Sequence, residues 1–295
     1  VPNPSARNLK ITDSNTIAVV IKGITNPFFY PIIGEFQRLL QKEGYNFLLS
    51  SVNEHDNEYT SARLLAIEKN LSGLIFMGGH LAASVHELDN IRCPYVMCTV
   101  DLSHNDRVQT LNYVSVDDVA ESARMTRYLL ELGHRRLVFL TTPDGKHSVS
   151  NLREQGFRQA LESFPAQVQA EVIRVAESNY YYSYGSGYEA MRKLLEERRD
   201  FTAVYAISDT LAIGALKALH EAGLRVPEDC SLAGFDGIDL CLYSNPTLTS
   251  LAQPAEAMAA YTVELLCNLL KGKVKHGHKV FAGELIPRDS TRSIL

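Results

Sequence analysis

The sequence predicts an α/β protein built from two similar lobes, each a doubly wound parallel sheet with helices on both faces. Three observations support this fold class. Short apolar runs alternate with helical patterns along almost the whole chain, which is typical of parallel sheets. The alternation starts twice, and each series contains enough strands for a sheet of its own. A length of 295 residues is large for one core but comfortable for two.

The first series begins at Thr16. In its first helix Phe29, Ile32 and Phe36 belong to an apolar face that repeats at three and four residues. Gly44 follows that helix, at a position where a left-handed cap is common. Strands are expected at 16–21, 45–51, 73–77 and 95–98, and helices at 29–43, 57–70 and 82–90.

The second series begins at Tyr113. A strand at 248–251 then leads through Pro254 into a crossing, a helix at 255–270 and two short strands around Val280 and Leu285. The other strands of this series are expected at 113–116, 136–140, 171–175, 203–207 and 231–235, and its helices at 117–132, 152–163, 184–198 and 208–222.

These elements divide the chain into a linker and two lobes that are joined by several crossovers. Residues 1–12 form the linker, in which Asn3 and Pro4 begin a short helix. About two helical turns do not hold alone in water, so this segment is expected to order only when it docks on something. The first lobe is expected to contain 13–114 and 253–274, and the second lobe 115–252 and 275–295.

The composition restricts the class of protein. A net charge of −5 gives no overall attraction for nucleic acid or an anionic membrane, although a basic module outside this chain is not excluded. No run approaches the ~20 apolar residues that span a bilayer, so no membrane partner is expected. Five cysteines without a CxxC pattern indicate free thiols in a reducing compartment, and we expect the protein to be cytoplasmic.

The sequence contains no signature of an enzyme, a metal site or a cofactor site. A G-x-G-x-x-G after the first strand, a P-loop, a G-x-S-x-G elbow and an H-E-x-x-H pair are all absent. His276 and His278 flank a glycine, which is too weak a pattern for a metal site. We therefore expect no catalytic residue, no metal ligand and no cofactor.

Candidate ligand groups lie where strands end. Asp236 follows the buried strand at 231–235, and ligands of open α/β sheets bind beyond the carboxyl ends of the strands. A carboxylate accepts several hydrogen bonds, which suits sugar hydroxyls, but Asp-Gly is also a common turn that satisfies its own backbone. In the first lobe, Phe28 and Phe29 lie in the first strand-to-helix loop, and one ring is expected to enter the crevice. The alternative is a helix entry packed as a hydrophobic staple.

Three further groups follow the same logic. Asp209 begins the helix after the strand at 203–207, where the helix dipole alone would also explain an acidic residue. Arg153 near a helix start opposes the dipole preference, which favours a specific partner over a solvated surface position. Tyr180, Tyr181, Tyr182 and Tyr184 are more tyrosines than a simple loop needs, and one or two are expected to line the crevice.

Taken together, these segments resemble the lactose/galactose repressor (LacI/GalR) family of bacterial transcription regulators, over essentially the whole chain. Single motifs are weak, but their ordered set is highly specific. The matching segments are 1–10, Asn26-Pro27-Phe28-Phe29, Val116-Asp117-Asp118, Leu132-Gly133-His134-Arg135-Arg136, 153–157, 208–215, 223–229, Gly234-Phe235-Asp236, Pro246-Thr247-Leu248-Thr249-Ser250 and Arg288-Asp289-Ser290-Thr291.

The resemblance implies a two-lobed core of the periplasmic-binding-protein-like type I fold, preceded by a helix-turn-helix headpiece that binds operator DNA. This sequence starts at Val1 rather than at methionine, and it is expected to begin at the hinge helix without that headpiece. In relatives the hinge helix orders on DNA and its leucine wedges into the minor groove. The residues implied in this contact are Asn3, Arg7, Leu9 and Lys10, with Leu9 as the wedge. A homodimer is also implied.

The resemblance further implies which residues contact a small-molecule effector. Phe28 and Phe29 would come from the first lobe, and Arg153, Tyr182, Asp209 and Asp236 from the second. Two positions depart from relatives. Thr99 stands where many relatives have Asp, with Asp101 two residues further on, and His147 stands where the purine-binding relative has Arg. These departures favour a sugar as the effector.

The expected function is therefore the effector-binding and dimerisation core of a transcriptional repressor that senses a sugar and controls operator binding allosterically. The alternative is a periplasmic sugar-binding protein of a transporter, which would share the fold and much of the crevice chemistry. The hinge-like segment at 3–10 and the unpaired cysteines argue against that alternative. An enzyme is a third class, disfavoured by the absent motifs.

Overall fold

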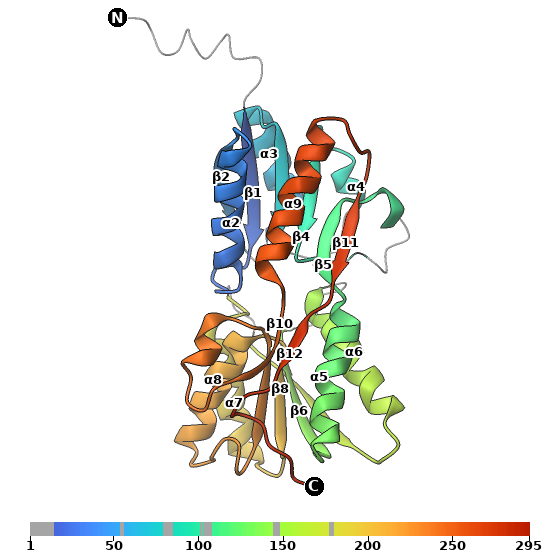
Figure 1. Ribbon diagram of the computed structural model, residues 1–295. Helices are drawn as coiled ribbons and strands as arrows, with labels where there is room; N and C mark the ends of the chain where they lie inside the picture. The colour runs from blue at the N-terminus through green and yellow to red at the C-terminus, as the bar shows by residue number, and fades with distance from the viewer. Residues whose placement is uncertain are drawn as a thin grey trace, which may run out of the picture.

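The computed structural model describes residues 15–53, 56–78, 85–100, 102, 108–143, 148–176 and 180–295. Two α/β lobes are stacked end to end, and the chain passes between them several times (Figure 1). Each lobe has a six-stranded sheet with helices on both faces, as the sequence predicts. Among the helices of these described residues, none is long and apolar enough to cross a membrane.

The sheet of the first lobe has the strand order β11-β5-β4-β3-β1-β2, and all its neighbours are parallel. Its strands are β1 (Thr16–Lys22), β2 (Asn46–Val52), β3 (Gly73–Met77), β4 (Tyr95–Cys98), β5 (Tyr113–Val116) and β11 (His278–Phe281). Its helices are α2 (Phe29–Lys42), α3 (Glu58–Lys69), α4 (Val85–Leu88) and α9 (Ala255–Leu270), with the short turn η1 (Val108–Thr110).

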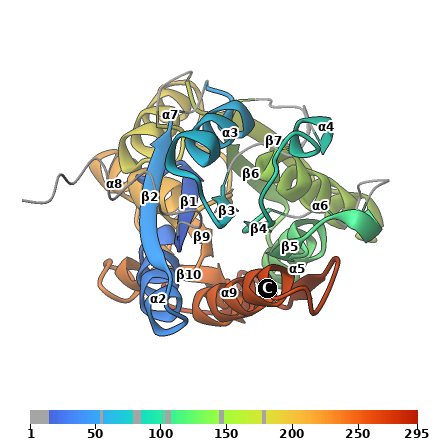
Figure 2. The same cartoon turned by 90° about the horizontal axis from the view of Figure 1, so that it is seen from above.

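Successive side chains of β1 pack against different layers of helices. Ile17, Val19 and Ile21 pack into the cluster that contains α2 and α9, whereas Ala18 and Val20 pack into the cluster that contains α3. Successive side chains of a strand point to opposite faces, so an uninterrupted apolar run serves both layers of helices. Seen from above, α2 and α9 cover one face of this sheet and α3 and α4 cover the other (Figure 2).

The sheet of the second lobe has the order β12-β10-β9-β8-β6-β7. Only β12 runs antiparallel to its neighbour within this sheet. Its strands are β6 (Arg136–Thr141), β7 (Gln169–Arg174), β8 (Ala203–Ala206), β9 (Ser231–Asp236), β10 (Thr249–Ala252) and β12 (Glu284–Ile286). Its helices are α5 (Asp118–Glu131), α6 (Val149–Ser163), α7 (Tyr184–Glu197) and α8 (Asp209–Glu221), with the turn η2 (Asp239–Leu242).

Side-chain caps decide where the helices of the second lobe begin. Asp117, Ser148 and Ser208 each accept a hydrogen bond from a backbone N–H in the first turn of α5, α6 and α8. The cap at Ser148 starts α6 three residues earlier than the expected Leu152. Arg153 therefore lies in the second turn of its helix, where the unfavourable dipole that the sequence suggested has already weakened.

The expected lobe boundaries differ from the observed strand pairing in two places. β5 pairs with β4, so the first sheet extends through Val116 and beyond the expected limit at 114. β11 then pairs with β5, so the chain after 275 first returns to the first lobe before β12 joins the second. The exposed edge of β5 explains the return, because its unpaired backbone groups are satisfied by adding a strand.

Candidate functional site

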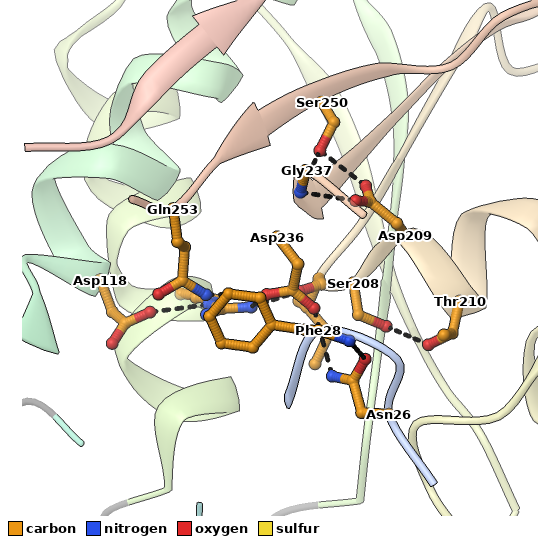
Figure 3. Close-up of polar contacts among 12 residues, drawn as sticks. Asn26, Phe28, Asp118, Ser208, Asp209, Thr210, Asp236, Gly237, Ser250 and Gln253 are labelled. Atoms are coloured by element: carbon orange, nitrogen blue, oxygen red, sulfur yellow. Dashed lines mark hydrogen bonds and ion pairs between the residues drawn. The ribbon is translucent and has the colours of Figure 1, made fainter. Parts of the chain in front are cut away.

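Asp236 is the point at which the two lobes and a crossover meet. It ends β9 with a positive φ of 112° and is 4% exposed. Asn26 of the first lobe donates from Nδ2 to its Oδ2 at 3.2 Å. Gln253, on the crossover after β10, donates from Nε2 to its Oδ1 at 2.8 Å, and Arg153 donates from Nη1 to the same oxygen at 3.4 Å. Figure 3 shows this arrangement around Asp236.

Arg153 is a buried cation with partners on several elements. Its Nε donates to Asp118 Oδ1 at 2.7 Å and its Nη1 donates to the carbonyl oxygen of Ile207 at 2.6 Å. The guanidinium lies over the Phe235 ring, 3.6 Å from the centroid. Burial alone lowers the pKa of Arg153, but the Asp118 and Asp236 carboxylates raise it, and the net shift is upward. The side chain therefore stays charged.

Burial acts on the Asp236 carboxyl in the opposite sense. It raises the pKa of Asp236, whereas Arg153, Asn26 and Gln253 lower it by stabilising the ionised form. The net shift is upward because the carboxyl is almost fully removed from water. Asp236 is thus a carboxylate that the surrounding donors hold in one orientation, which is what recognition of a polar ligand needs.

Asp209 braces the loop that follows Asp236. Its Oδ2 accepts hydrogen bonds from the backbone N–H groups of Gly237 and Ile238 at 2.6 and 2.8 Å, and its Oδ1 accepts one from Ser250 Oγ at 2.7 Å. Burial, and then the charge of Asp236, raise the pKa of Asp209 to about 7. Both oxygens are directed into the second lobe, so these contacts give Asp209 a positioning role. Its expected contact with an effector stays a prediction.

The two phenylalanines of the first lobe take different roles, and both rings are buried. Phe28 stands at the N-cap of α2, and its backbone N–H donates to Asn26 Oδ1 at 3.1 Å. Its side chain lines, with Asp236 and Gln253, a groove of about 730 Å³ between the lobes. Phe29 lies against the end of β3, where a Cβ on Gly78 would come within 3.3 Å of its ring. Phe28 is therefore the ring that enters the interlobe region.

Thr99 ends β4 in a conformation that is rare for its type. Its φ is 66°, and a β-branched residue with positive φ is an outlier. Its Oγ1 accepts a hydrogen bond from the backbone N–H of Gly78 at 3.1 Å. Thr99 and Asp236 thus end a central strand in each lobe with strained backbone, and such strain concentrates at functional sites.

Comparison with known proteins supports the two-lobed fold and identifies the family of this chain. The family described as a periplasmic binding protein-like domain matches residues 126–291. The HTH-type transcriptional regulator MalR of Clostridium butyricum is 33% identical over the whole chain and 87% of that protein. This chain belongs to the LacI family of transcriptional regulators. The HTH-type transcriptional repressor CytR of Escherichia coli K12 is 32% identical over the whole chain and 84% of that protein.

A solved LacI-family regulator extends the comparison to structure. The regulator from Enterococcus faecium, with bound ribose, is 25% identical, covers 95% of this chain with all of its own, and superposes with a TM-score of 0.79. The sequence-based assignment to this family is confirmed. Because the relatives that match over the whole of this chain are transcriptional regulators, the regulator is favoured over the binding protein of a transporter.

The remaining residues that were predicted to contact the effector or DNA differ in where they lie in this LacI-family chain. Tyr182 is half-buried and close enough to Arg153 to raise its pKa. Tyr180 and Tyr184 are largely at the surface. His147 and the hinge residues Asn3, Arg7, Leu9 and Lys10 lie outside the described residues, so their predicted roles stay predictions. Within the described residues, no group of three side chains is placed to hold a metal ion.

Sequence reasoning did not select three residues that the LacI-family core places at the site. These are Asn26, Asp118 and Gln253, which bond to Asp236 or Arg153. A signal for Gln253 was present, because β9 and β10 are parallel neighbours whose ends align at Asp236 and Ala252. The residue after Ala252 therefore had to emerge beside Asp236. Asn26 had no comparable signal, since its partner is 210 residues away.

Proposed function

We propose that this LacI-family regulator binds a sugar between its lobes and that binding controls operator DNA through a homodimer. The observation that carries the proposal is the Asp236–Arg153 pair, which places a buried acceptor and a buried donor side by side at the junction of the lobes. No catalytic role is assigned, and the proposed site of action is the cytoplasm, where operator DNA is found.

The unused bonding positions of the pair match a sugar. An ionised carboxylate has about four acceptor positions, and Asp236 uses three of them for Asn26, Gln253 and Arg153. Arg153 uses its Nε and Nη1 groups, and within the described residues its Nη2 donates no hydrogen bond. One acceptor position thus lies beside two N–H donors. A sugar hydroxyl both donates and accepts, so neighbouring hydroxyls can bind both groups together.

The surroundings also suit a small polar ring with apolar faces. Phe28 gives an aromatic wall beside Asp236, and both residues line an interlobe groove of about 730 Å³, a volume within the ~300–1,000 Å³ of small-molecule pockets, which reaches Asp236 but not Arg153. The Enterococcus faecium relative, which holds ribose, supports a monosaccharide as the first candidate.

The position of the site explains how binding would reach DNA. Asp236 ends a strand of the second lobe and is bonded to Asn26 of the first lobe and to Gln253 of a crossover, so a ligand that bonds to Asp236 contacts the residue where these parts meet. Such a ligand prefers one interlobe angle, and a difference in affinity between two states is what allostery requires. That the relative CytR is a repressor supports the same role here.

A binding screen tests this proposal. Melting temperature is measured with D-ribose, other pentoses and hexoses, disaccharides and purine nucleobases, because a ligand of the native state raises it. We expect a sugar to raise the melting temperature of the wild type, and Asp236→Asn to lose at least tenfold in affinity for that sugar. A shift produced by nucleobases alone, or an unchanged affinity in Asp236→Asn, would show that the proposal is wrong.

A gel-shift experiment tests the regulatory part. Full-length protein is incubated with DNA from its own promoter region, with and without the sugar that raises the melting temperature. The expected result is a specific complex whose affinity changes with the sugar. Equal DNA affinity in both conditions would contradict allosteric control.

A further inference from the structure

We propose that Asn26 forms an interlobe latch on Asp236, whose carboxylate Gln253 orients from the start of the crossover, and that the latch holds the lobes closed and presents the remaining acceptor position of the carboxylate to a ligand. The latch is the hydrogen bond from Asn26 Nδ2 to Asp236, and Gln253 holds Asp236 through hydrogen bonds from its Nε2 and its backbone N–H. The consequence for effector binding rests on the proposed function, whereas lobe closure does not.

Asn26 is oriented by its own loop. Its Oδ1 accepts the backbone N–H of Phe28 at 3.1 Å, and its backbone N–H donates to the carbonyl oxygen of Gly23 at 3.0 Å. With the amide oxygen occupied, Nδ2 must point away from the loop, and it meets Asp236 Oδ2 across the junction of the lobes. The side chain is buried, so this hydrogen bond is protected from water. The loop therefore presents a donor to the second lobe in a fixed direction.

Gln253 binds the same residue from the crossover. Its Nε2 donates to Asp236 Oδ1 at 2.8 Å and its backbone N–H donates to the Asp236 carbonyl oxygen at 3.1 Å. The next residues lead through Pro254 into α9 of the first lobe. Gln253 therefore ties the start of the crossover to Asp236 and orients its carboxylate, and Asn26 supplies the hydrogen bond from the first lobe.

The latch and a ligand share one oxygen. Oδ1 already accepts from Gln253 and Arg153, so the open acceptor position belongs to Oδ2, which Asn26 also binds. The donor from the first lobe thus orients the atom that a ligand hydroxyl would use. If the ligand binds only the closed state, its apparent affinity falls in proportion to the closed fraction. Opening the latch therefore weakens ligand binding without removing a ligand contact.

An isosteric exchange tests the latch without any ligand. In Asn26→Asp one oxygen still accepts the Phe28 N–H, and the other faces the Asp236 carboxylate at pH 8 and repels it. Small-angle scattering should then show a radius of gyration about 1 Å above the ~19 Å expected for a chain of this length. The double variant Asn26→Asp/Asp236→Asn reverses donor and acceptor and should return the wild-type value.

A matched control carries the same charge change elsewhere. Asn46 is exposed at the start of β2, at the end of the first lobe away from Asp236, so Asn46→Asp should scatter like the wild type. Gln253→Leu, which removes the donor that orients Asp236 Oδ1 but keeps the bond from Asn26, should raise the radius of gyration by less than Asn26→Asp does. Wild-type scattering in Asn26→Asp, or a double variant that stays open while its circular dichroism is native, overturns the latch.

Titration with D-ribose separates the latch from the proposed function. If the wild type binds ribose, Asn26→Asp should bind it about tenfold more weakly. The double variant should close and yet not regain affinity, because the amide introduced by Asp236→Asn places an N–H group where the open acceptor was. Closure results as expected without ribose binding would leave the latch standing and count against a ribose effector. Wild-type ribose affinity in an opened Asn26→Asp variant would refute the link between closure and binding.

Discussion

Replacing Arg153 by methionine tests the electrostatic centre of the core most directly. Arg153 is 4% exposed, and the change keeps an unbranched apolar stem and removes its guanidinium. Asp118 and Asp236, which are also buried, then lose their cation, and the carbonyl oxygen of Ile207 loses its donor. Burying a charge without its partner is costly because the group cannot recover its hydration.

The expected loss is large on the scale of protein stability. Breaking a buried ion pair by removing one partner costs about 3–5 kcal/mol, and an unsatisfied buried acceptor costs about 1–3 kcal/mol. Because the three contacts share one group, these costs overlap, and we expect Arg153→Met to lower the free energy of unfolding by about 3–5 kcal/mol. Adding Asp118→Asn should recover part of this loss, because it removes one of the two carboxylates that Arg153 neutralises.

Urea denaturation provides the measurement. Unfolding is followed by far-ultraviolet circular dichroism and by tyrosine fluorescence, because the chain has no tryptophan. Arg158→Met is the matched control, since Arg158 lies on the same helix with a 56% exposed side chain paired to Glu154 at 2.7 Å. Exposed pairs contribute about 0–1 kcal/mol, so this control should change little. A loss below about 1 kcal/mol in Arg153→Met would refute a stabilising buried pair.

Two further predictions concern the brace under Asp236. Burial raises the pKa of Asp209 to about 7, above an unfolded value of about 3.9, so its contribution to stability falls as pH rises from about 4 to 7. Asp209→Asn should remove this fall. The measurement is the difference in free energy of unfolding between wild type and variant, from urea melts across that pH range, and a constant difference would contradict the prediction. Because both proteins contain His134, whose pKa is lowered by burial, its contribution cancels in the difference. Gly237→Ala should cost at least ~1 kcal/mol more than Gly44→Ala in the same assay. Both glycines have positive φ, but only at Gly237 would a Cβ meet Ala252, at 2.4 Å. Equal costs would argue against that close approach.

Local patterns predicted much of the fold. The helix expected at 255–270 has the observed bounds of α9, and β6, β8 and β9 lie within one residue of their expected limits. Period-two burial and amphipathic spacing are properties of neighbouring residues, so they can be read without the tertiary structure. The helix expected at 82–90 is the short α4 over Val85–Leu88. Helix α6 begins before its expected start because Ser148 caps it, and the sequence pattern did not reveal that cap.

The site, like the fold, was only partly predictable from local sequence patterns. Asp236 and Arg153 were selected from their places at a strand end and a helix start, and the structure brings them together. Asn26 and Gln253 were missed because nothing local marks an asparagine or a glutamine as a partner of a buried carboxylate. Asp209 was predicted to contact the effector, which stays a prediction, and in the structure its hydrogen bonds hold the loop after β9 and Ser250 of β10. A helix-start carboxylate looks alike in sequence whether it faces a ligand or a backbone.

The two α/β lobes, the family, the carboxylate at the end of β9 and the guanidinium near the start of α6 could all be predicted from the amino-acid sequence. Each of these depends on short-range order, because strand periodicity, helix caps and the sheet-edge rule act within a few residues. The return of β11 to the first sheet and the meeting of Asn26 and Gln253 on Asp236 became visible only in the three-dimensional structure. These contacts join residues far apart in the chain, and their formation depends on the packing of both lobes.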